Sequence, residues 1–183
     1  MTPGRSLFGP TIDGLDEKFD RALEVVRENG TLARVFQAAS ALGDFSLIWH
    51  LFGVARGTTS DRRAVQALAL SALLGAESLV VNQGVKRLFK RERPTTSGDD
   101  RFEVRTPSTS SFPSGHASSA VFAAMILSAF GGRRWAPFWY TVAAVVGLSR
   151  AVVRIHHASD VAGGAVIGAL LGAIARRVVT RLR

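Results

Sequence analysis

Cysteine is absent from the 183 residues, which excludes a disulfide framework and a thiolate site. The first thirty residues lack a long apolar run and carry six acidic side chains, so we expect no cleavable signal peptide. Strand-like alternation of apolar and polar residues, long repeats and low-complexity linkers are also missing. These absences predict a single all-α domain over residues 1–183.

Charged and apolar residues occupy separate parts of the chain. It is 47% hydrophobic with a formal net charge of +9, and its basic residues are concentrated between long apolar blocks. Strong basicity is typical of proteins that bind nucleic acid or another anionic surface. A nucleic-acid-binding protein, however, usually carries Lys and Arg along a soluble amphipathic element. The pattern therefore favours a membrane protein with a phosphate-binding surface and no nucleic-acid partner.

Five apolar blocks make up most of the chain. They span about residues 32–55, 64–85, 117–132, 135–149 and 161–175. The last three are shorter than the roughly 20 residues of a full span, but flanking turns can supply the missing length. We expect a polytopic membrane helical bundle of about five transmembrane helices. A soluble all-α bundle is the alternative, disfavoured because five such blocks leave little polar helical surface for water.

An amphipathic helix is predicted over residues 15–29, within an N-terminal segment of residues 1–30. Such a helix either lies on the membrane surface or covers one end of the bundle. Alternation of five spans places it on the same side as the connectors 86–112 and 150–160. Every polar residue of chemical interest lies in these two connectors, so residues 86–160 form the predicted catalytic region.

The first polar cluster runs from Lys86 to Pro94. Lys86 and Arg93 are seven residues apart, which predicts two cations on one helical face, with Pro94 ending the helix. Two such cations form a clamp for an anion, and Arg adds bidentate phosphate geometry. A determinant of membrane topology is the alternative for this basic run.

The second cluster, residues 111–116, immediately precedes an apolar helix. Ser114 and Gly115 present a hydroxyl and backbone N–H groups at a helix N-terminus, where anions bind. His116 lies at the same end, although an isolated histidine at a helix start is more often a cap or a surface residue.

The third cluster contains Arg150, His156 and Asp160. His156 and Asp160 have the i, i+4 spacing at which a carboxylate accepts the Nδ1–H of an imidazole and leaves Nε2 free. Arg150 faces the same anion only if the helix breaks near residues 154–156. A membrane-edge ion pair with a snorkelling arginine is the alternative. Together the three clusters suit phosphoryl transfer, and the chain lacks a Walker loop and a carboxylate cluster for a metal.

The three clusters resemble the signatures of the type 2 phosphatidic acid phosphatase superfamily, which includes lipid phosphatases and vanadium haloperoxidases. The resemblance implies that His156 is the nucleophile and forms a phosphohistidine, that Asp160 orients it, and that His116 is the acid and then the base. It assigns the phosphoryl oxygens to Lys86, Arg93, Ser114, Gly115 and Arg150, with no metal or other cofactor. Family members often have Tyr-Pro where this chain has His157-Ala158, so His157 is expected to be an accessory residue at most.

The predicted function is therefore an integral-membrane lipid phosphatase similar to bacterial undecaprenyl-diphosphate phosphatases. A polyprenyl phosphate or diphosphate is the first expected substrate. Phosphatidic acid, phosphatidylglycerol phosphate and decaprenylphosphoryl phosphoribose remain open. A vanadium haloperoxidase is disfavoured because those enzymes are larger and soluble, and a non-catalytic membrane protein because the clusters are intact.

Orientation and three intramembrane polar residues are not assigned by the sequence. The numbers of Lys and Arg on the two sides are too similar for the positive-inside rule. The family resemblance favours the bacterial plasma membrane with an extracytoplasmic catalytic face, and the oligomeric state is left unknown. For Asp44, His50 and Glu77 we expect structural hydrogen bonds or a position near the interface.

Overall fold

The computed structural model describes residues 7–94, 101–102, 104 and 107–180, and in these residues the regular structure is helical. The α-helices are α1 (Pro10–Ala22), α2 (Glu24–Glu28), α3 (Gly30–Gly43), α4 (Leu47–Gly57), α5 (Asp61–Ser78), α6 (Gly115–Gly131), α7 (Ala136–Val152) and α8 (Ala158–Val179). Side chains define several helix starts: Asn29 and Ser60 accept hydrogen bonds from backbone N–H groups in the first turns of α3 and α5. The all-α prediction is confirmed.

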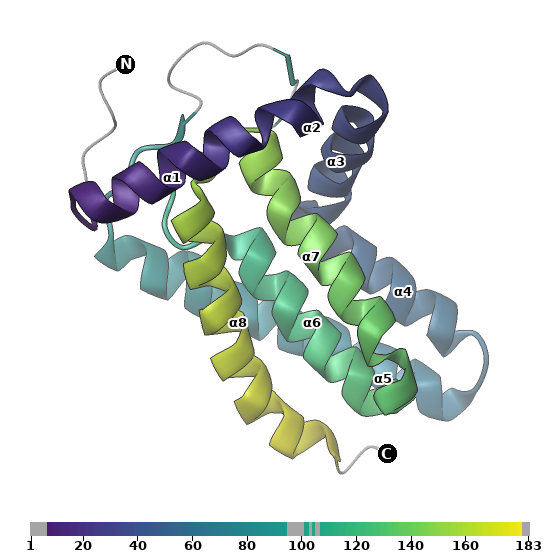
Figure 1. Ribbon diagram of the computed structural model, residues 1–183. Coiled ribbons are helices and arrows are strands. Elements are labelled where there is room, and N and C mark those ends of the chain that lie inside the picture. Colours follow the sequence, from purple (N-terminus) through teal and green to yellow (C-terminus); the bar gives the residue numbers. More distant parts are fainter. Residues whose placement is uncertain (1–6, 95–100, 103, 105–106, 181–183) are drawn as a thin grey trace.

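Helix α6 lies at the centre of the bundle, where it contacts α5, α7 and α8 (Figure 1). The buried core forms around its apolar residues together with Trp49 of α4, Leu70 and Leu74 of α5 and Trp139 of α7. Every residue from Ala117 to Ala120 is buried as well. A helix apolar on most sides is typical of a bundle centre, which explains why a block without ionisable residues lies there.

The two faces of α8 show how the bundle meets a membrane. Gly164 and Gly168 face α6, where an added Cβ atom would overlap the carbonyl oxygens of Ser114 and Ser118. On the outer side, apolar residues four apart are about 60% exposed: Val166 59%, Leu170 62%, Ile174 62% and Val178 61%. Small residues inside and large apolar residues outside are the arrangement of a helix between protein and lipid.

Three helical segments are long and apolar enough to cross a membrane. They are Gly30–Gly57, Asp61–Leu88 and Ala158–Val179, and α6 is a shorter apolar helix. The segment Gly30–Gly57 bends between α3 and α4, where Phe45 and Ser46 have positive φ angles. The membrane bundle is thus confirmed, while five full spans remain a prediction.

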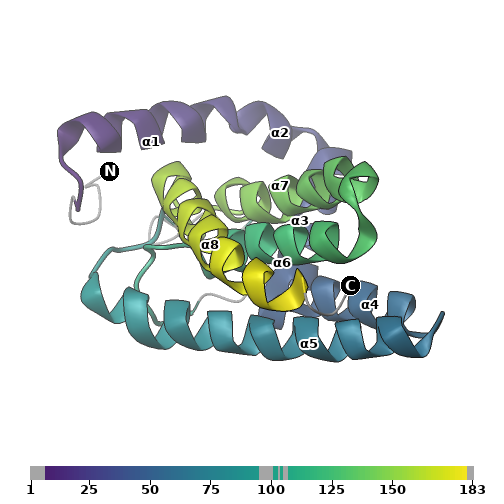
Figure 2. The same cartoon turned by 90° about the horizontal axis from the view of Figure 1, so that it is seen from below.

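The amphipathic N-terminal segment lies across one end of the bundle (Figures 1 and 2). It begins earlier than predicted, at Pro10, and divides near Leu23 into α1 and α2. α1 contacts α8, and α2 contacts α7. Of the two predicted placements, the structure therefore has the helix covering the end of the bundle.

Candidate active site

The predicted site residues gather at the end of the bundle covered by α1. The end of α7, the starts of α6 and α8 and the segment that follows Leu88 all reach this end (Figure 1). Of the eight predicted residues, Gly115 and His116 are half-buried and the other six are less than a tenth exposed. Alternation of the spans thus brings the three clusters together, as predicted.

A sharp turn between α7 and α8 carries His156. Helix α7 ends at Val152, and Arg154 has a φ of 55°, a left-handed conformation that is uncommon outside glycine. The backbone N–H groups of Ile155 and His156 both donate to the carbonyl of Arg150, at 3.0 Å each. The predicted helix break is confirmed, and it turns the imidazole back toward the end of α7.

Polar groups contact both nitrogens of His156, which is only 3% exposed. Nδ1 lies 3.3 Å from Ser111 Oγ, and Nε2 lies 3.2 Å from Arg93 Nη1. Because a guanidinium only donates, Nε2 accepts from Arg93 and the ring proton is assigned to Nδ1. Burial lowers the pKa of His156 to about 3, opposed by Asp160 and assisted by Arg93. The ring is therefore neutral, with a lone pair on Nε2.

Ser111 bridges His156 and Asp160. Asp160 Oδ2 lies 3.6 Å from His156 Nδ1, so the pair predicted from the i, i+4 spacing is in ion-pair contact, although this distance is longer than a hydrogen bond. His156 precedes α8, so the two residues do not share a helical face. Instead the Ser111 hydroxyl accepts from Nδ1–H at 3.3 Å and donates to Oδ2 at 2.5 Å. Oδ2 also accepts from the backbone N–H of His157 at 2.8 Å.

Arg93 reaches the site on extended chain. The helix that carries Lys86 ends at Leu88 as a 3₁₀ turn, and Phe89 is extended with φ −122° and ψ 148°. The prediction that Pro94 ends a helix with Lys86 and Arg93 on one face is therefore wrong. Arg93 is held from both sides: Nη1 donates to Ile155 O at 3.1 Å, and Nη2 donates to Thr109 O at 3.1 Å. Burial lowers the pKa of Arg93 from its ordinary value.

Lys86 and Arg150 complete the set of cations. Lys86 is 6% exposed and interacts electrostatically with Arg93, Arg150 and Asp160. Arg150 is 2% exposed, and its Nη1 donates to Ser40 Oγ. Its Nε is buried with no hydrogen-bond partner in the part of the chain that the structure describes. A buried guanidinium donor without an acceptor suits a ligand that brings oxygen atoms.

The start of α6 has the predicted geometry. Ser114 is the N-cap, and its side chain accepts from the backbone N–H of Ala117. The N–H of Ser114 donates to the carbonyl of Asp160 at 3.0 Å, which joins the second and third clusters. His116 Nε2 lies 3.2 Å from Ser40 O and 3.1 Å from Asp44 Oδ1.

Asp44 lies in the site, where the sequence left it unassigned. Besides its contact with His116, its Oδ1 lies 3.9 Å from Arg150 Nη1. The neighbouring Gly43 faces the His116 ring so closely that an added Cβ atom would overlap Cδ2. The role of Asp44 depends on its position at the bend between α3 and α4, opposite α6. That position follows only from the packing of the bundle.

A second group that sequence reasoning missed connects α1 to Asp160. Asp16 is 6% exposed, and its carboxylate accepts from Arg91 Nη2 at 2.7 Å and from Ser159 Oγ at 2.6 Å. Arg91 Nη1 in turn donates to Asp160 Oδ1 at 2.6 Å. One oxygen of Asp160 is thus held by Arg91, and the other faces Ser111. The only signal in the sequence was an arginine two residues before Arg93, inside a run of basic residues.

Charged residues of α1 and α2 also hold the turn that carries His156. Arg27 is 4% exposed and donates to Val152 O at 2.8 Å. Arg154 Nη2 lies 3.1 Å from Asp20 Oδ2 and 3.2 Å from Glu24 Oε2. These contacts tie the left-handed turn to the covering helices.

His50 and Glu77 make structural hydrogen bonds, as expected. His50 Nδ1 lies 2.9 Å from Ser71 Oγ, and Glu77 accepts from Ser118 Oγ. Among the described residues no group of His, Asp and Glu side chains could hold a metal ion.

This arrangement is suited to a phosphoryl group. Three buried cations and a helix N-terminus supply positive charge for the phosphoryl oxygens. The lone pair of a neutral imidazole points to Arg93, so a phosphate bound by that arginine would lie beside a nucleophile. His116 Nε2 lies 3.1 Å from Asp44 Oδ1, and histidine is the residue that most often transfers protons in active sites.

Known proteins are similar to this chain in sequence and in fold. The family model of the PAP2 superfamily matches residues 64–183. The decaprenylphosphoryl-5-phosphoribose phosphatase of Mycobacterium tuberculosis is 32% identical over 151 residues, covering 82% of this chain and 81% of that protein. The protein of the same name from Mycolicibacterium smegmatis is 34% identical over 130 residues, covering 70% and 68%.

Two solved structures have the same fold. The transmembrane PAP2 type phosphatidylglycerolphosphate phosphatase from Bacillus subtilis gives a TM-score of 0.74 at 22% identity, covering 97% of this chain and 90% of that one. LpxE from Aquifex aeolicus gives 0.71 at 23% identity, covering 89% and 95%. Both likenesses support a membrane bundle of the kind described above.

Proposed function

This chain belongs to the PAP2 superfamily of membrane lipid phosphatases, and we propose that it removes a terminal phosphate monoester from a polyprenyl-linked lipid through a phosphohistidine. The observation that carries this proposal is the buried imidazole of His156 with its Nε2 3.2 Å from Arg93 Nη1.

The reaction proceeds in two balanced steps. In the first, His156 Nε2 attacks phosphorus and the bond to the lipid oxygen breaks, while His116 protonates the leaving alkoxide. In the second, His116 takes a proton from water, the water oxygen attacks the phosphohistidine, and the P–N bond breaks to release inorganic phosphate. Lys86, Arg93 and Arg150 neutralise the charge on the phosphoryl oxygens in both steps.

Other groups bind the phosphoryl oxygens or keep the nucleophile in position. Ser114 and the backbone N–H of Gly115 add donors for the phosphoryl oxygens. Asp160, acting through Ser111, stabilises the Nδ1–H tautomer and the positive charge that develops on the ring. Asp16 and Arg91 are positioning residues, because they touch Asp160 or its neighbours and not the reacting atoms.

The substrate we propose is a polyprenylphosphoryl pentose phosphate. The relatives above 30% identity carry the name decaprenylphosphoryl-5-phosphoribose phosphatase, and each alignment covers more than two thirds of both proteins. This likeness favours a sugar phosphate on a polyprenyl carrier over the polyprenyl diphosphate expected from the sequence. The exposed apolar rows of the bundle suit the polyprenyl chain.

A substrate panel tests the proposal. Purified protein in detergent is given decaprenylphosphoryl-5-phosphoribose, undecaprenyl diphosphate, phosphatidic acid, phosphatidylglycerol phosphate and water-soluble ribose 5-phosphate, and phosphate release is measured. We expect the highest kcat/KM for the first compound. Acid-labile, base-stable radiolabel on the protein after rapid quenching would report the phosphohistidine. Faster turnover of ribose 5-phosphate than of every lipid would contradict the lipid assignment.

We also propose that the catalytic face is extracytoplasmic. Because the chain lacks cysteine, a single introduced cysteine is labelled without background. Ser108→Cys lies at the catalytic end and Thr58→Cys at the opposite end, and both positions are exposed. In intact cells a membrane-impermeant maleimide should label Ser108→Cys and spare Thr58→Cys. The reverse pattern would place the catalytic face in the cytoplasm.

A further inference from the structure

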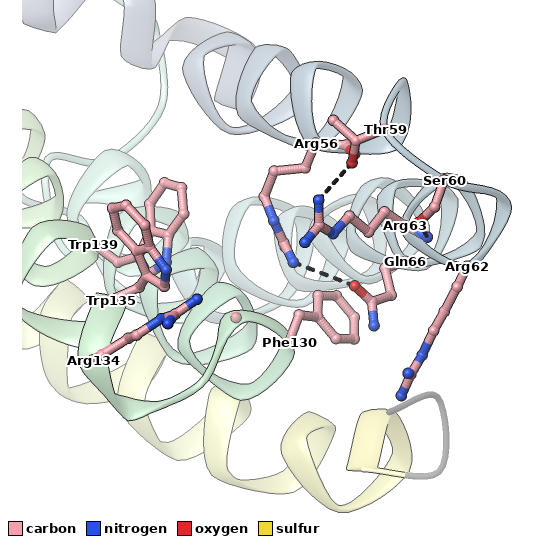
Figure 3. A pocket seen from close by; sticks show the side chains of 11 residues that line it. Arg56, Thr59, Ser60, Arg62, Arg63, Gln66, Phe130, Arg134, Trp135 and Trp139 are labelled. Carbon is pink, nitrogen blue, oxygen red and sulfur yellow. Dashed lines mark hydrogen bonds between the residues drawn. The ribbon is translucent and has the colours of Figure 1, made fainter.

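A pocket of about 700 Å³ lies at the end of the bundle away from the catalytic site. It opens between the hairpin that joins α4 to α5 and the turn that joins α6 to α7 (Figure 3). Its wall includes four arginines and two tryptophans: Arg56, Arg62, Arg63, Arg134, Trp135 and Trp139. No residue of the catalytic site contributes to it.

Among the described residues, the arginines of this pocket have no acidic partners. No carboxylate lines the pocket, and none lies within ion-pair distance of the four guanidinium groups in the described residues. Arg56 and Arg63 repel each other electrostatically. An anion in the pocket would remove that repulsion.

Neutral contacts hold two of these side chains in place. Arg56 Nη2 donates to Gln66 Oε1 at 3.3 Å, and the guanidinium lies 6.0 Å from the ring centroid of Phe130. Arg63 Nη1 donates to Thr59 Oγ1 at 2.7 Å. Figure 3 shows Arg134 reaching toward them from the α7 side. Each guanidinium keeps further N–H donors for a ligand, because it has five.

We propose that this pocket binds the phosphate head group of an anionic phospholipid in the leaflet opposite the catalytic face. Arginine binds phosphate oxygens bidentately, and basic pockets between membrane helices bind acidic head groups. Trp135 is 49% exposed at the pocket mouth, and tryptophan is enriched at the level of lipid head groups. A free phosphate has the same charge but lacks acyl chains to lie against the apolar flanks of α4 and α5.

Basic residues at the end of a membrane bundle can also serve only to set its orientation in the membrane. Arg176 and Arg177 near the end of α8 are exposed and do not line the pocket, yet they also carry positive charge on this side of the bundle. If the basic residues only direct membrane insertion, replacing these two arginines and replacing the pocket arginines should have the same effect on lipid binding. If the pocket is a binding site, only the pocket arginines should affect lipid binding.

Trp135 provides a local probe of lipid binding. The chain has three tryptophans. Trp49 is fully buried at 0% exposed and Trp139 is 6% exposed, so lipid quenchers report mainly on Trp135. The full chain is titrated in detergent with dibrominated phosphatidylglycerol or dibrominated phosphatidylcholine, and tryptophan fluorescence is recorded. We expect half-quenching at about tenfold less phosphatidylglycerol, and little quenching by either lipid in Trp135→Phe.

Variants separate the site from general charge. Arg56→Gln/Arg63→Gln/Arg134→Gln should lose the preference for phosphatidylglycerol, whereas Arg176→Gln/Arg177→Gln should keep it. Both variants should retain phosphate release within about twofold, because neither touches the catalytic end. If the triple variant fails to fold, Arg134→Gln replaces it, since Arg134 is exposed and should lower the preference by about threefold.

Three results would overturn the proposal. Equal quenching by the two lipids would remove the selectivity for an acidic head group. An equal effect of the Arg176→Gln/Arg177→Gln pair would leave only general charge. Abolition of the lipid preference by excess inorganic phosphate would make free phosphate the ligand in place of a lipid.

Discussion

The two ends of the bundle use arginine in opposite ways. At the catalytic end Arg27, Arg91 and Arg93 are buried and donate to carboxylates or backbone carbonyls. At the other end the pocket arginines have no carboxylate partners among the described residues. Buried, paired arginines have fixed geometry, which a reaction centre requires, whereas arginines without acidic partners keep their charge available to a mobile anion. Substitutions at the catalytic end should therefore change kcat, and those at the other end should change lipid binding.

The largest effect should come from His156→Asn. Loss of Nε2 removes the nucleophile, so phosphate release should fall by at least about 1,000-fold and the radiolabelled intermediate should disappear. His157→Asn is the matched control, because asparagine also caps a helix and His157 is the N-cap of α8. Its phosphate release should stay within about fivefold. Similar losses in both variants would contradict the assignment of His156.

Neutralising Asp16 should have the next largest effect, although Asp16 touches no reacting atom. Asp16→Asn weakens the contact with Arg91 and so lets Asp160 shift, which should lower kcat by about 10- to 100-fold with little change in KM. Asp13→Asn removes the same charge from α1 at a residue 3.8 Å from Arg91. It should change kcat by less than about threefold.

Two further measurements test whether Asp16 acts by positioning Asp160 or only through the charge of α1. Asp16→Asn combined with Asp160→Asn should be less harmful than the product of the single effects, because both substitutions act through one chain of contacts. Comparable kcat losses in Asp16→Asn and Asp13→Asn would show that the charge of α1 matters and its placement does not. Arg63→Gln in the opposite pocket should leave kcat unchanged.

A smaller loss is expected from one methyl group beside His116. Gly43→Ala places a Cβ atom against the imidazole and should lower kcat by about tenfold while the protein stays folded. Gly75→Ala is the control within α5, where an added Cβ atom meets nothing within 4 Å. It should raise the free energy of unfolding by about 0.5–1 kcal/mol and leave kcat unchanged. Thermal unfolding and turnover measured on both variants decide between these outcomes.

The smallest effect concerns the protonation of His156. Its pKa of about 3 lies below the ordinary value of 6.5, mainly because of burial. The unfolded chain therefore takes up a proton near pH 6.5 that the folded protein does not, so this residue makes folding less favourable as pH falls from about 6.5 to 3. Nitrogen NMR of labelled histidines, with His156→Asn for assignment, should show a neutral ring at pH 5. A protonated ring at that pH would contradict the burial that the structure shows.

Much of the fold could be predicted because it depends on residues that are close in the chain. A long apolar block of the sequence leaves water for a bundle interior or for lipid, and in either place it forms a helix that satisfies its own backbone hydrogen bonds. Ser114 caps α6 through an N–H three residues away. The break before His156 followed from the need to bring Arg150 and His156 together, and the grouping of the three clusters followed from alternation of the spans.

The predicted and observed geometries differ where one sequence spacing fits several backbone conformations. Seven residues between Lys86 and Arg93 suit two helical turns, but the chain leaves the helix after Leu88 and continues extended. Four residues between His156 and Asp160 suit one helical turn, yet the helix starts only at Ala158. In both cases contacts from other elements determine the backbone: Arg93 with the loop that precedes α6, and Asp160 with Ser111 and Arg91.

Composition and local spacing were thus enough for the membrane bundle, for the single domain as an expectation and for the identity of the eight candidate site residues. They could not provide Ser111, Asp44, Arg91 or Asp16, whose partners lie far away in sequence. Asp16 and Ser159 are 143 residues apart and hydrogen-bond at 2.8 Å only because α1 packs across the start of α8. Such contacts depend on the relative placement of whole helices, which follows from the packing of Gly164 and Gly168 against α6 and of α1 over the bundle end, and not from any local pattern.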